Sequence, residues 1–152
     1  MIKKFIIIII STLFIYSCDY TPIYSEKNIE NFYIEKINFE GDNNINILLK
    51  NNLKRYFKAK DAKKYIIKAS SNYTKTSQSK NESGNTTYYL LNLKVVFEIK
   101  SENKKNDLNI EEKFVMKNYS NEYDENNYEK SVQKNMTNLI VEKLILQLSK
   151  MK

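Results

Sequence analysis

The sequence predicts an α+β fold, a two-layer sandwich of a four-stranded, mostly antiparallel sheet with two helices on one face. Three successive segments that fit strands are joined by short polar connections, which favours antiparallel pairing. Two further segments, residues 44–58 and 127–148, repeat apolar residues at steps of three and four, as amphipathic helices do. Packing both helices on the sheet gives the two layers. The expected order is strand, helix, strand, strand, strand, helix.

The first strand is expected at residues 32–39, followed by the first helix. Alternation in this strand is imperfect, and its two faces are expected to carry Tyr33, Ile37 and Phe39, and Phe32 and Ile34, respectively. Gly41 and Asp42 mark a break and a helix start. The apolar stripe of the helix that follows consists of Ile45, Leu48, Leu49, Leu53 and Phe57. This stripe predicts a helix that packs on the sheet.

The next three strands are expected at residues 65–76, 88–99 and 108–119. The second strand places Tyr65, Ile67, Ala69, Ser71 and Tyr73 on one face. The third alternates strictly over its whole length, with Tyr89, Leu91, Leu93, Val95, Phe97 and Ile99 on one face. The fourth places Leu108, Ile110, Phe114 and Met116 together. Residues 88–91 are apolar on both faces, which fits either contact with a partner or a cover of loops.

Polar connections separate these elements. Residues 77–85 predict a hairpin turn or a mobile loop, and residues 101–107 predict another turn. Residues 119–128 are expected to form a loop rich in tyrosine and asparagine. The stripe of the last helix consists of Val132, Met136, Leu139, Ile140, Leu144 and Leu148, widened by Val141 and Ile145. A face this wide is expected for burial against a sheet.

The N-terminal residues carry a lipoprotein signal. Two lysines precede an apolar run over residues 5–15, which is shorter than the ~20 residues that a helix needs to cross a bilayer. Ile15 and Ser17 occupy positions −3 and −1 before Cys18, so these residues form the flank of a signal peptidase cleavage site. The predicted organisation is a cleaved signal peptide at 1–17, a lipidated tether at 18–31 and a single domain at 32–152.

Cys18 is the only cysteine of the chain, so disulfides are excluded and lipidation is the interpretation that fits its position. The expected modification is a covalent diacylglycerol and an N-acyl lipid such as palmitate, and no other cofactor is expected. Two or more acyl chains hold a protein stably at a membrane. Removal of residues 1–17 leaves 135 of the 152 residues and lowers the net charge from +7 to +5. Export and the lack of an arginine-rich helix argue against nucleic acid as a partner.

The residues available for catalysis are few. The chain has no histidine and its cysteine is assigned to lipid, which excludes Ser–His and Cys–His nucleophiles and histidine or thiolate metal sites. Two glycines are too few for a phosphate-binding loop. The acidic pairs Glu111–Glu112 and Asp124–Glu125 stand beside lysines, which indicates a solvated surface rather than acid–base chemistry. The sequence therefore predicts a binding protein and not an enzyme.

The order of elements and the residues after Cys18 resemble the LPS-assembly lipoprotein family LptE, in its short alphaproteobacterial form. Mature chains of that family begin with Cys, a small residue, an aromatic residue, a spacer, Pro, an aliphatic residue and Tyr. Here the run is Cys18, Asp19, Tyr20, Thr21, Pro22, Ile23 and Tyr24, which departs from the pattern at Asp19. The family's Leu-Arg-Asn-x-Leu run is matched by Leu49, Lys50, Asn51, Asn52 and Leu53, with lysine in place of arginine.

The resemblance implies a lipoprotein on the periplasmic side of the Gram-negative outer membrane. Such a protein binds and plugs the LptD β-barrel, helps it to fold and takes part in lipopolysaccharide assembly. Residues 77–85 and 119–128 would line the polar interior of that barrel, and exposed lysines would meet lipid A phosphates. The family motifs assign no particular lipopolysaccharide-binding residue in this sequence.

Asp19 leaves two membranes possible as the location of the protein, because aspartate at this position tends to keep lipoproteins of enteric bacteria in the inner membrane. One alternative is therefore an auxiliary periplasmic lipoprotein of a lipid ABC transporter. A second is a structural lipoprotein without a barrel partner, which would be stable as a monomer.

Overall fold

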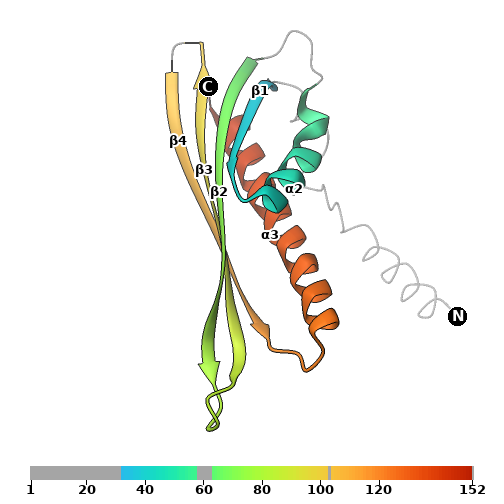
Figure 1. Ribbon diagram of the computed structural model, residues 1–152. Coiled ribbons are helices and arrows are strands. Elements are labelled where there is room, and N and C mark those ends of the chain that lie inside the picture. The colour runs from blue at the N-terminus through green and yellow to red at the C-terminus, as the bar shows by residue number, and fades with distance from the viewer. Residues whose placement is uncertain (1–31, 58–62, 103, 152) are drawn as a thin grey trace, which may run out of the picture.

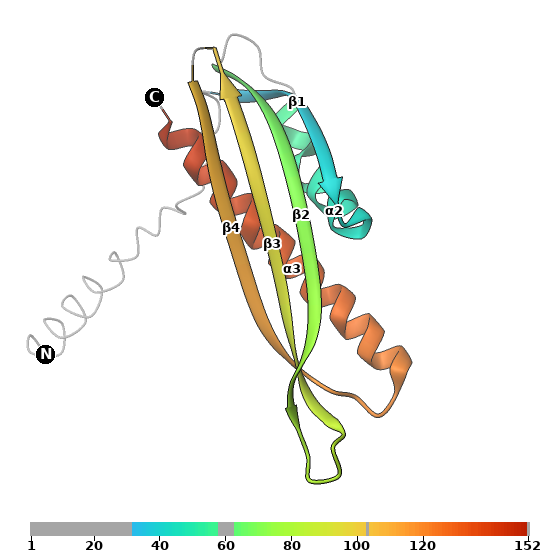
Figure 2. The same ribbon diagram turned by 60° about the vertical axis from the view of Figure 1, so that its left-hand side comes forward.

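The computed structural model describes residues 32–57, 63–102 and 104–151, and these residues form the predicted two-layer sandwich (Figure 1). The sheet consists of β1 (Phe32–Gly41), β2 (Lys63–Lys80), β3 (Thr86–Ser101) and β4 (Lys104–Lys117), side by side in chain order. The helices are α2 (Asn43–Leu53), which continues into the 3₁₀ turn η3 (Lys54–Phe57), and α3 (Glu122–Lys150). Both helices cover the same face of the sheet (Figure 2). The predicted fold class and element order are confirmed.

The sheet is mixed, because α2 carries the chain from β1 back to the start of β2. β1 and β2 are therefore parallel, whereas β2 with β3 and β3 with β4 are antiparallel. Inward-facing side chains from the three long strands meet α3 and α2 in one core. The buried set includes Tyr65, Ile67, Ala69, Leu91, Leu93, Val95, Phe97, Ile99, Ile110 and Met116, as the alternation predicts.

The predicted faces of β1 were wrong. A bulge at Glu35 shifts the register between Ile34 and Lys36. One extra residue reverses the alternation, so Phe32 and Ile34 before the bulge face the helices, as do the half-buried Ile37 and Phe39 after it. The imperfect alternation in the sequence is therefore the mark of a bulge.

The first helix ends earlier than predicted. Asp42 caps α2 by accepting a hydrogen bond from Ile45 N at 3.0 Å, as expected, but the α-helix stops at Leu53. The chain then tightens into η3, which buries Tyr56 in a stack on Phe32 with ring centroids 6.2 Å apart. Tyr56 does not lie on the predicted stripe. Residue 58, the expected end of the helix, lies outside the described residues.

The two polar connections within the sheet, at residues 77–85 and 101–107, form more strand than predicted. Residues 77–80 extend β2, because Ser77 and Ser79 hydroxyls pair with Thr86 and Thr87 across the ladder at 2.9 and 2.7 Å. β4 begins at Lys104 instead of residue 108, since polar side chains at an exposed strand end do not prevent backbone pairing. β4 also ends at Lys117, before residue 119.

α3 begins at Glu122, inside the loop expected at residues 119–128. Asn121 caps it, because its side-chain oxygen accepts a hydrogen bond from Tyr123 N at 2.9 Å. The acidic residues in the first turn interact favourably with the positive end of the helix dipole. The predicted stripe is buried except for Leu139, whose side chain is 46% exposed. Thr137 takes the buried position, and its hydroxyl donates to Gln133 O at 2.7 Å within the same helix.

Gly41 makes the turn from β1 into α2 possible. Its φ of +92° is in the left-handed region, and a Cβ at this position would lie 1.8 Å from Ser71 O. That carbonyl accepts from Asp42 N at 3.2 Å, while Ser71 Oγ lies 2.8 Å from Asn46 Oδ1. The buried Ser71 therefore fixes the start of α2 against β2.

We expect Gly41→Ala to lower the free energy of unfolding by about 3 kcal/mol or more, because it adds a backbone clash to an unfavourable φ. Gly84→Ala is the matched control: its φ is +81°, but a Cβ there meets nothing within 4 Å. The control should cost about 1–2 kcal/mol. Urea unfolding of the two variants measures the difference, and equal losses would contradict the role of the Ser71 contact.

Candidate functional site

The β2–β3 hairpin extends beyond the helix layer as a polar arm (Figure 1). We call residues 76–87 the hairpin arm. Nine of these twelve residues carry a neutral hydroxyl or amide side chain, and the other three are Lys80, Glu82 and Gly84. None of them is buried. The arm therefore adds nothing to the core, and it presents a hydrogen-bonding surface with no net charge.

The arm is nevertheless ordered by its own hydrogen bonds. At its tip, Asn81 N donates to Asn85 O at 2.9 Å, and Asn81 Oδ1 accepts from Asn85 N at 2.8 Å. Two register shifts between Ser77 and Lys80 mark bulges, which increase the twist of the ladder. Asn118, just after β4, donates to Thr86 O at 2.8 Å and to Thr87 O at 2.9 Å. The arm therefore leaves the sheet in a defined direction.

A partly buried ionic cluster, which we call the clamp, holds the base of the arm to α3. Lys75 Nζ lies 2.7 Å from Glu125 Oε1 and 2.8 Å from Glu129 Oε2. Tyr73 OH donates to Glu129 Oε1 at 2.7 Å. Lys75 Nζ also lies 4.4 Å from the ring centroid of Tyr89, within the range of a cation–π interaction. All of these side chains lie on the helix-facing side, where the apolar core ends.

The electrostatics of the clamp favour its ionised form. Burial by itself lowers the pKa of Lys75, but hydrogen bonds and charge interactions with Glu125 and Glu129 outweigh burial and raise it. Burial likewise raises the pKa of Glu125, but the Lys75 ammonium and the Tyr119 amide outweigh it and lower the pKa. The pKa of Tyr73 is raised by burial and by donation to Glu129. The phenol therefore keeps its proton and acts as a donor.

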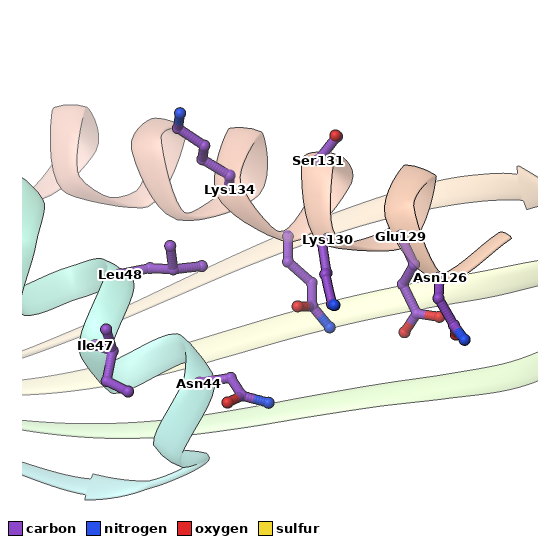
Figure 3. Close-up of a pocket in the computed structure, with 9 residues that line it drawn as sticks. Asn44, Ile47, Leu48, Asn126, Glu129, Lys130, Ser131 and Lys134 are labelled. Carbon is purple, nitrogen blue, oxygen red and sulfur yellow. The ribbon is translucent and has the colours of Figure 1, made fainter. Parts of the chain in front are cut away.

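Two hollows, lined mostly by polar and charged residues, open to solvent between α2 and α3. The first, of about 570 Å³, is lined by Asn44, Leu48, Lys130, Gln133 and Lys134 among others (Figure 3). The second, of about 650 Å³, lies beside Asn52 and Asn138, which are joined by a 2.7 Å hydrogen bond. Glu129 borders the first hollow, but its carboxylate is already engaged in the clamp.

The acidic pairs that the sequence singled out do not form sites. Glu111 and Glu112 point to opposite faces of β4, where Lys113 Nζ lies 3.2 Å from Glu111 and Lys143 pairs with Glu112. Asp124 is exposed, whereas its neighbour Glu125 belongs to the clamp. Among the residues with described positions, no three potential metal-ligating side chains come together.

The predicted lipidation residue Cys18, its flank Ile15 and Ser17, and the sorting residue Asp19 all lie outside the described residues. They therefore remain predictions, together with the signal peptide and the tether. Within the described ranges, no helix has both the length and the hydrophobicity to cross a membrane.

Sequence reasoning missed both the clamp and the extent of the arm. Lys75 is an even number of residues from Tyr65 and Tyr73 and therefore lies on the same face of the strand. This spacing was a signal that its charge faces the helix layer. The acidic first turn of α3 was the signal for its partners. Only the spatial arrangement brings Lys75 to Glu125, 50 residues further along the chain.

No family model and no curated protein sequence matches this chain. Solved structures do. The crystal structure of rare lipoprotein B from Shewanella oneidensis has a TM-score of 0.57 and 16% identity, covering 74% of this chain and 91% of that chain. The solution structure of lipoprotein B from Nitrosomonas europaea has a TM-score of 0.57 and 16% identity, covering 79% and 86%. A putative lipoprotein from Caulobacter crescentus has a TM-score of 0.55 and 13% identity, covering 82% and 92%.

We expect Lys75→Met to lower the free energy of unfolding at neutral pH by about 1–3 kcal/mol, because it leaves two largely buried carboxylates without their cation. The wild-type clamp stabilises the fold above the ordinary carboxyl pKa of 4.5, and this contribution is lost as the pH falls through the lowered pKa of Glu125. Urea unfolding between neutral pH and pH 3 measures both effects.

Lys143→Met is the matched control, because the Lys143 side chain is 55% exposed in its pair with Glu112. This control should change stability by less than about 1 kcal/mol. If Lys75→Met is equally mild, the clamp is not a stabilising element.

Proposed function

We propose that this chain, which has the fold of rare lipoprotein B, the LptE fold, is an LptE-type lipoprotein of the outer membrane. In this role it binds and plugs an LptD-like β-barrel and assists lipopolysaccharide assembly. The likeness to solved lipoproteins supports the fold on which this proposal rests. The barrel, the lipid substrate and the membrane are the parts that we infer.

The observation that carries the proposal is the hairpin arm. Large outer-membrane barrels have polar interiors, in which an apolar insert would be poorly matched and a charged one would need partners. The arm is neutral, polar and ordered without support from the core. The clamp fixes its base, so insertion into a lumen costs little conformational entropy. In this proposal the arm is the part that enters the barrel, and the helix layer stays at its periplasmic mouth.

The remainder of the proposal concerns the anchor. Acylation of Cys18 would hold the domain at the periplasmic face of the outer membrane. Asp19 favours one competing function, an auxiliary lipoprotein of a lipid ABC transporter that stays in the inner membrane. The two functions differ in the membrane fraction that contains the protein and in the protein that copurifies with it.

A C-terminally tagged chain, extracted gently from outer membranes, should copurify with an LptD-type barrel. Replacement of residues 78–88 by Asn-Gly joins Ser77 to Tyr89, which already pair across the ladder. This variant should keep its thermal stability, because the removed residues bury no core side chain, and should capture about tenfold less barrel or worse. Lys130→Gln/Lys134→Gln, with the arm intact, is the control and should capture the barrel normally. Undiminished capture by the shortened variant would refute the role of the arm.

Cys18→Ser should leave the unprocessed precursor in the inner membrane, because the acylated sulfur is missing. Mass spectrometry of the N-terminus and membrane fractionation measure this. Ser17→Ala keeps a small residue before the cysteine and should mature normally. A Cys18→Ser protein that is processed and sorted like the wild type would disprove lipidation.

A further inference from the structure

The sheet face opposite the helices is turned toward the viewer in Figure 2. At the end where β1 begins, the strand register gathers a basic patch on this face. Four residues form a continuous row across the strands, because Lys36 pairs with Ile66, Ile66 with Lys100, and Lys100 with Lys105. Neighbouring strands lie about 4.8 Å apart, so the row is about 14 Å long. It contains three lysines and no carboxylate.

The residues around this row extend its positive charge. Lys64 lies on the same face of β2 as Ile66, one pleat away, and pairs in register with Tyr33. Three carboxylates lie nearby. Glu98 is paired with Lys105 of the row at 3.1 Å, and Glu40 with Lys68 at 3.0 Å. Asp107, which is opposite Glu98 in the ladder, also interacts with the Lys105 charge. In the part of the chain that the structure describes, no carboxylate forms an ion pair with Lys36, Lys64 or Lys100.

The patch also has an apolar centre. Ile66 is 40% exposed although lysines flank it on β1 and β3, and the half-buried Tyr33 lies on the same face. Lysines around an exposed aliphatic and an aromatic side chain are typical of surfaces that rest on lipid headgroups, where apolar atoms reach the acyl boundary and ammonium groups meet phosphates.

The short stretch of chain between Cys18 and the patch favours the membrane as the partner of the patch. Tyr33 stands at the second position of β1, and only residues 19–31 separate Phe32 from Cys18. Thirteen residues reach at most about 45 Å even when fully extended. An acylated Cys18 would therefore keep the patch within reach of the bilayer surface, while an acidic protein would have to be recruited from solution.

We propose that the Lys36–Ile66–Lys100–Lys105 face, with Lys64 and Tyr33, docks on an anionic phospholipid bilayer and orients the lipid-anchored domain. The acyl chains supply attachment, and the patch supplies orientation through charge. This inference rests on the proposed lipid anchor of the preceding section, but not on the barrel. Docking is salt-sensitive, because the contact is electrostatic and lies at the membrane surface.

The test uses mature lipidated protein with Asn38→Cys, labelled with a fluorophore and reconstituted in vesicles that contain brominated lipid. Asn38 is exposed and pairs with Lys68 on the same face. The vesicles are phosphatidylcholine alone or with about 30 mol% phosphatidylglycerol, a charge density that attracts polybasic surfaces. Quenching of the label reports contact between this face and the bilayer.

We expect strong quenching only with phosphatidylglycerol, and its loss in 0.5 M salt, about a threefold rise in ionic strength over physiological. Lys36→Gln/Lys64→Gln/Lys100→Gln should weaken docking about fivefold per lysine. Lys50→Gln/Lys130→Gln/Lys134→Gln removes the same charge from exposed positions on α2 and α3 and should dock normally. Thermal unfolding checks that all variants are folded.

Equal quenching in the two lipid mixtures, or in the patch variant and the wild type, would overturn the proposal. Loss of a copurifying protein from the patch variant, without any quenching by lipid, would overturn it too and assign the face to a protein. If Cys18 proves to be unacylated, an N-terminal histidine tag on nickel-chelating lipid supplies the tether, and docking is still measured. Absence of a barrel from the copurified proteins would contradict the proposed function but not the docking of this face on lipid.

Discussion

The ion pairs of Lys75 with Glu125 and Glu129 mark the point on which the shape of the molecule depends, where the apolar core ends and the sheet continues. The 29 residues of α3 span about 44 Å, whereas the 18 residues of β2 span about 60 Å. A sheet longer than its helix layer cannot be apolar along its whole inner face. At this boundary, ion pairs take the place of apolar packing. The Lys75 ammonium neutralises the carboxylates of Glu125 and Glu129, and these contacts fix α3 to β2. Beyond the boundary lies the hairpin arm, which is polar and has no net charge.

The two ends of the sheet consequently have different chemistry. In the part of the chain that the structure describes, the end near the start of β1 has lysines without an ion pair on its open face. The opposite end is the hairpin arm, which has no net charge. A lipid anchor before β1 would place the charged end at the bilayer and direct the arm away from it. Orientation and insertion then belong to opposite ends of one sheet, while the anchor before the sheet supplies attachment, and each end has the residue types that its surroundings require.

Strands with strict alternation were predicted well from the sequence, since β3 buries every residue of its apolar series fully or in part. The errors arose where local pattern and tertiary context disagree. A single bulge residue at Glu35 inverted the faces of β1, and serine and threonine hydroxyls continued a ladder that composition assigned to a turn. Among the elements of the candidate site, the arm was visible as a polar segment between two strands. The clamp was not, because nothing local relates Lys75 to residues 50 positions away.

The neutrality of the arm also restricts how lipopolysaccharide can be handled. Lipid A phosphates need cations, and the arm offers one lysine, Lys80, close in sequence to Glu82. Phosphate contacts by this chain therefore have to come from lysines outside the arm, such as those of the open sheet face or the helix layer. An arm that inserts by hydrogen bonding should be nearly insensitive to salt, whereas contacts made by the basic patch should weaken as salt screens them. The dependence on ionic strength thus separates the two ends of the molecule without any substitution.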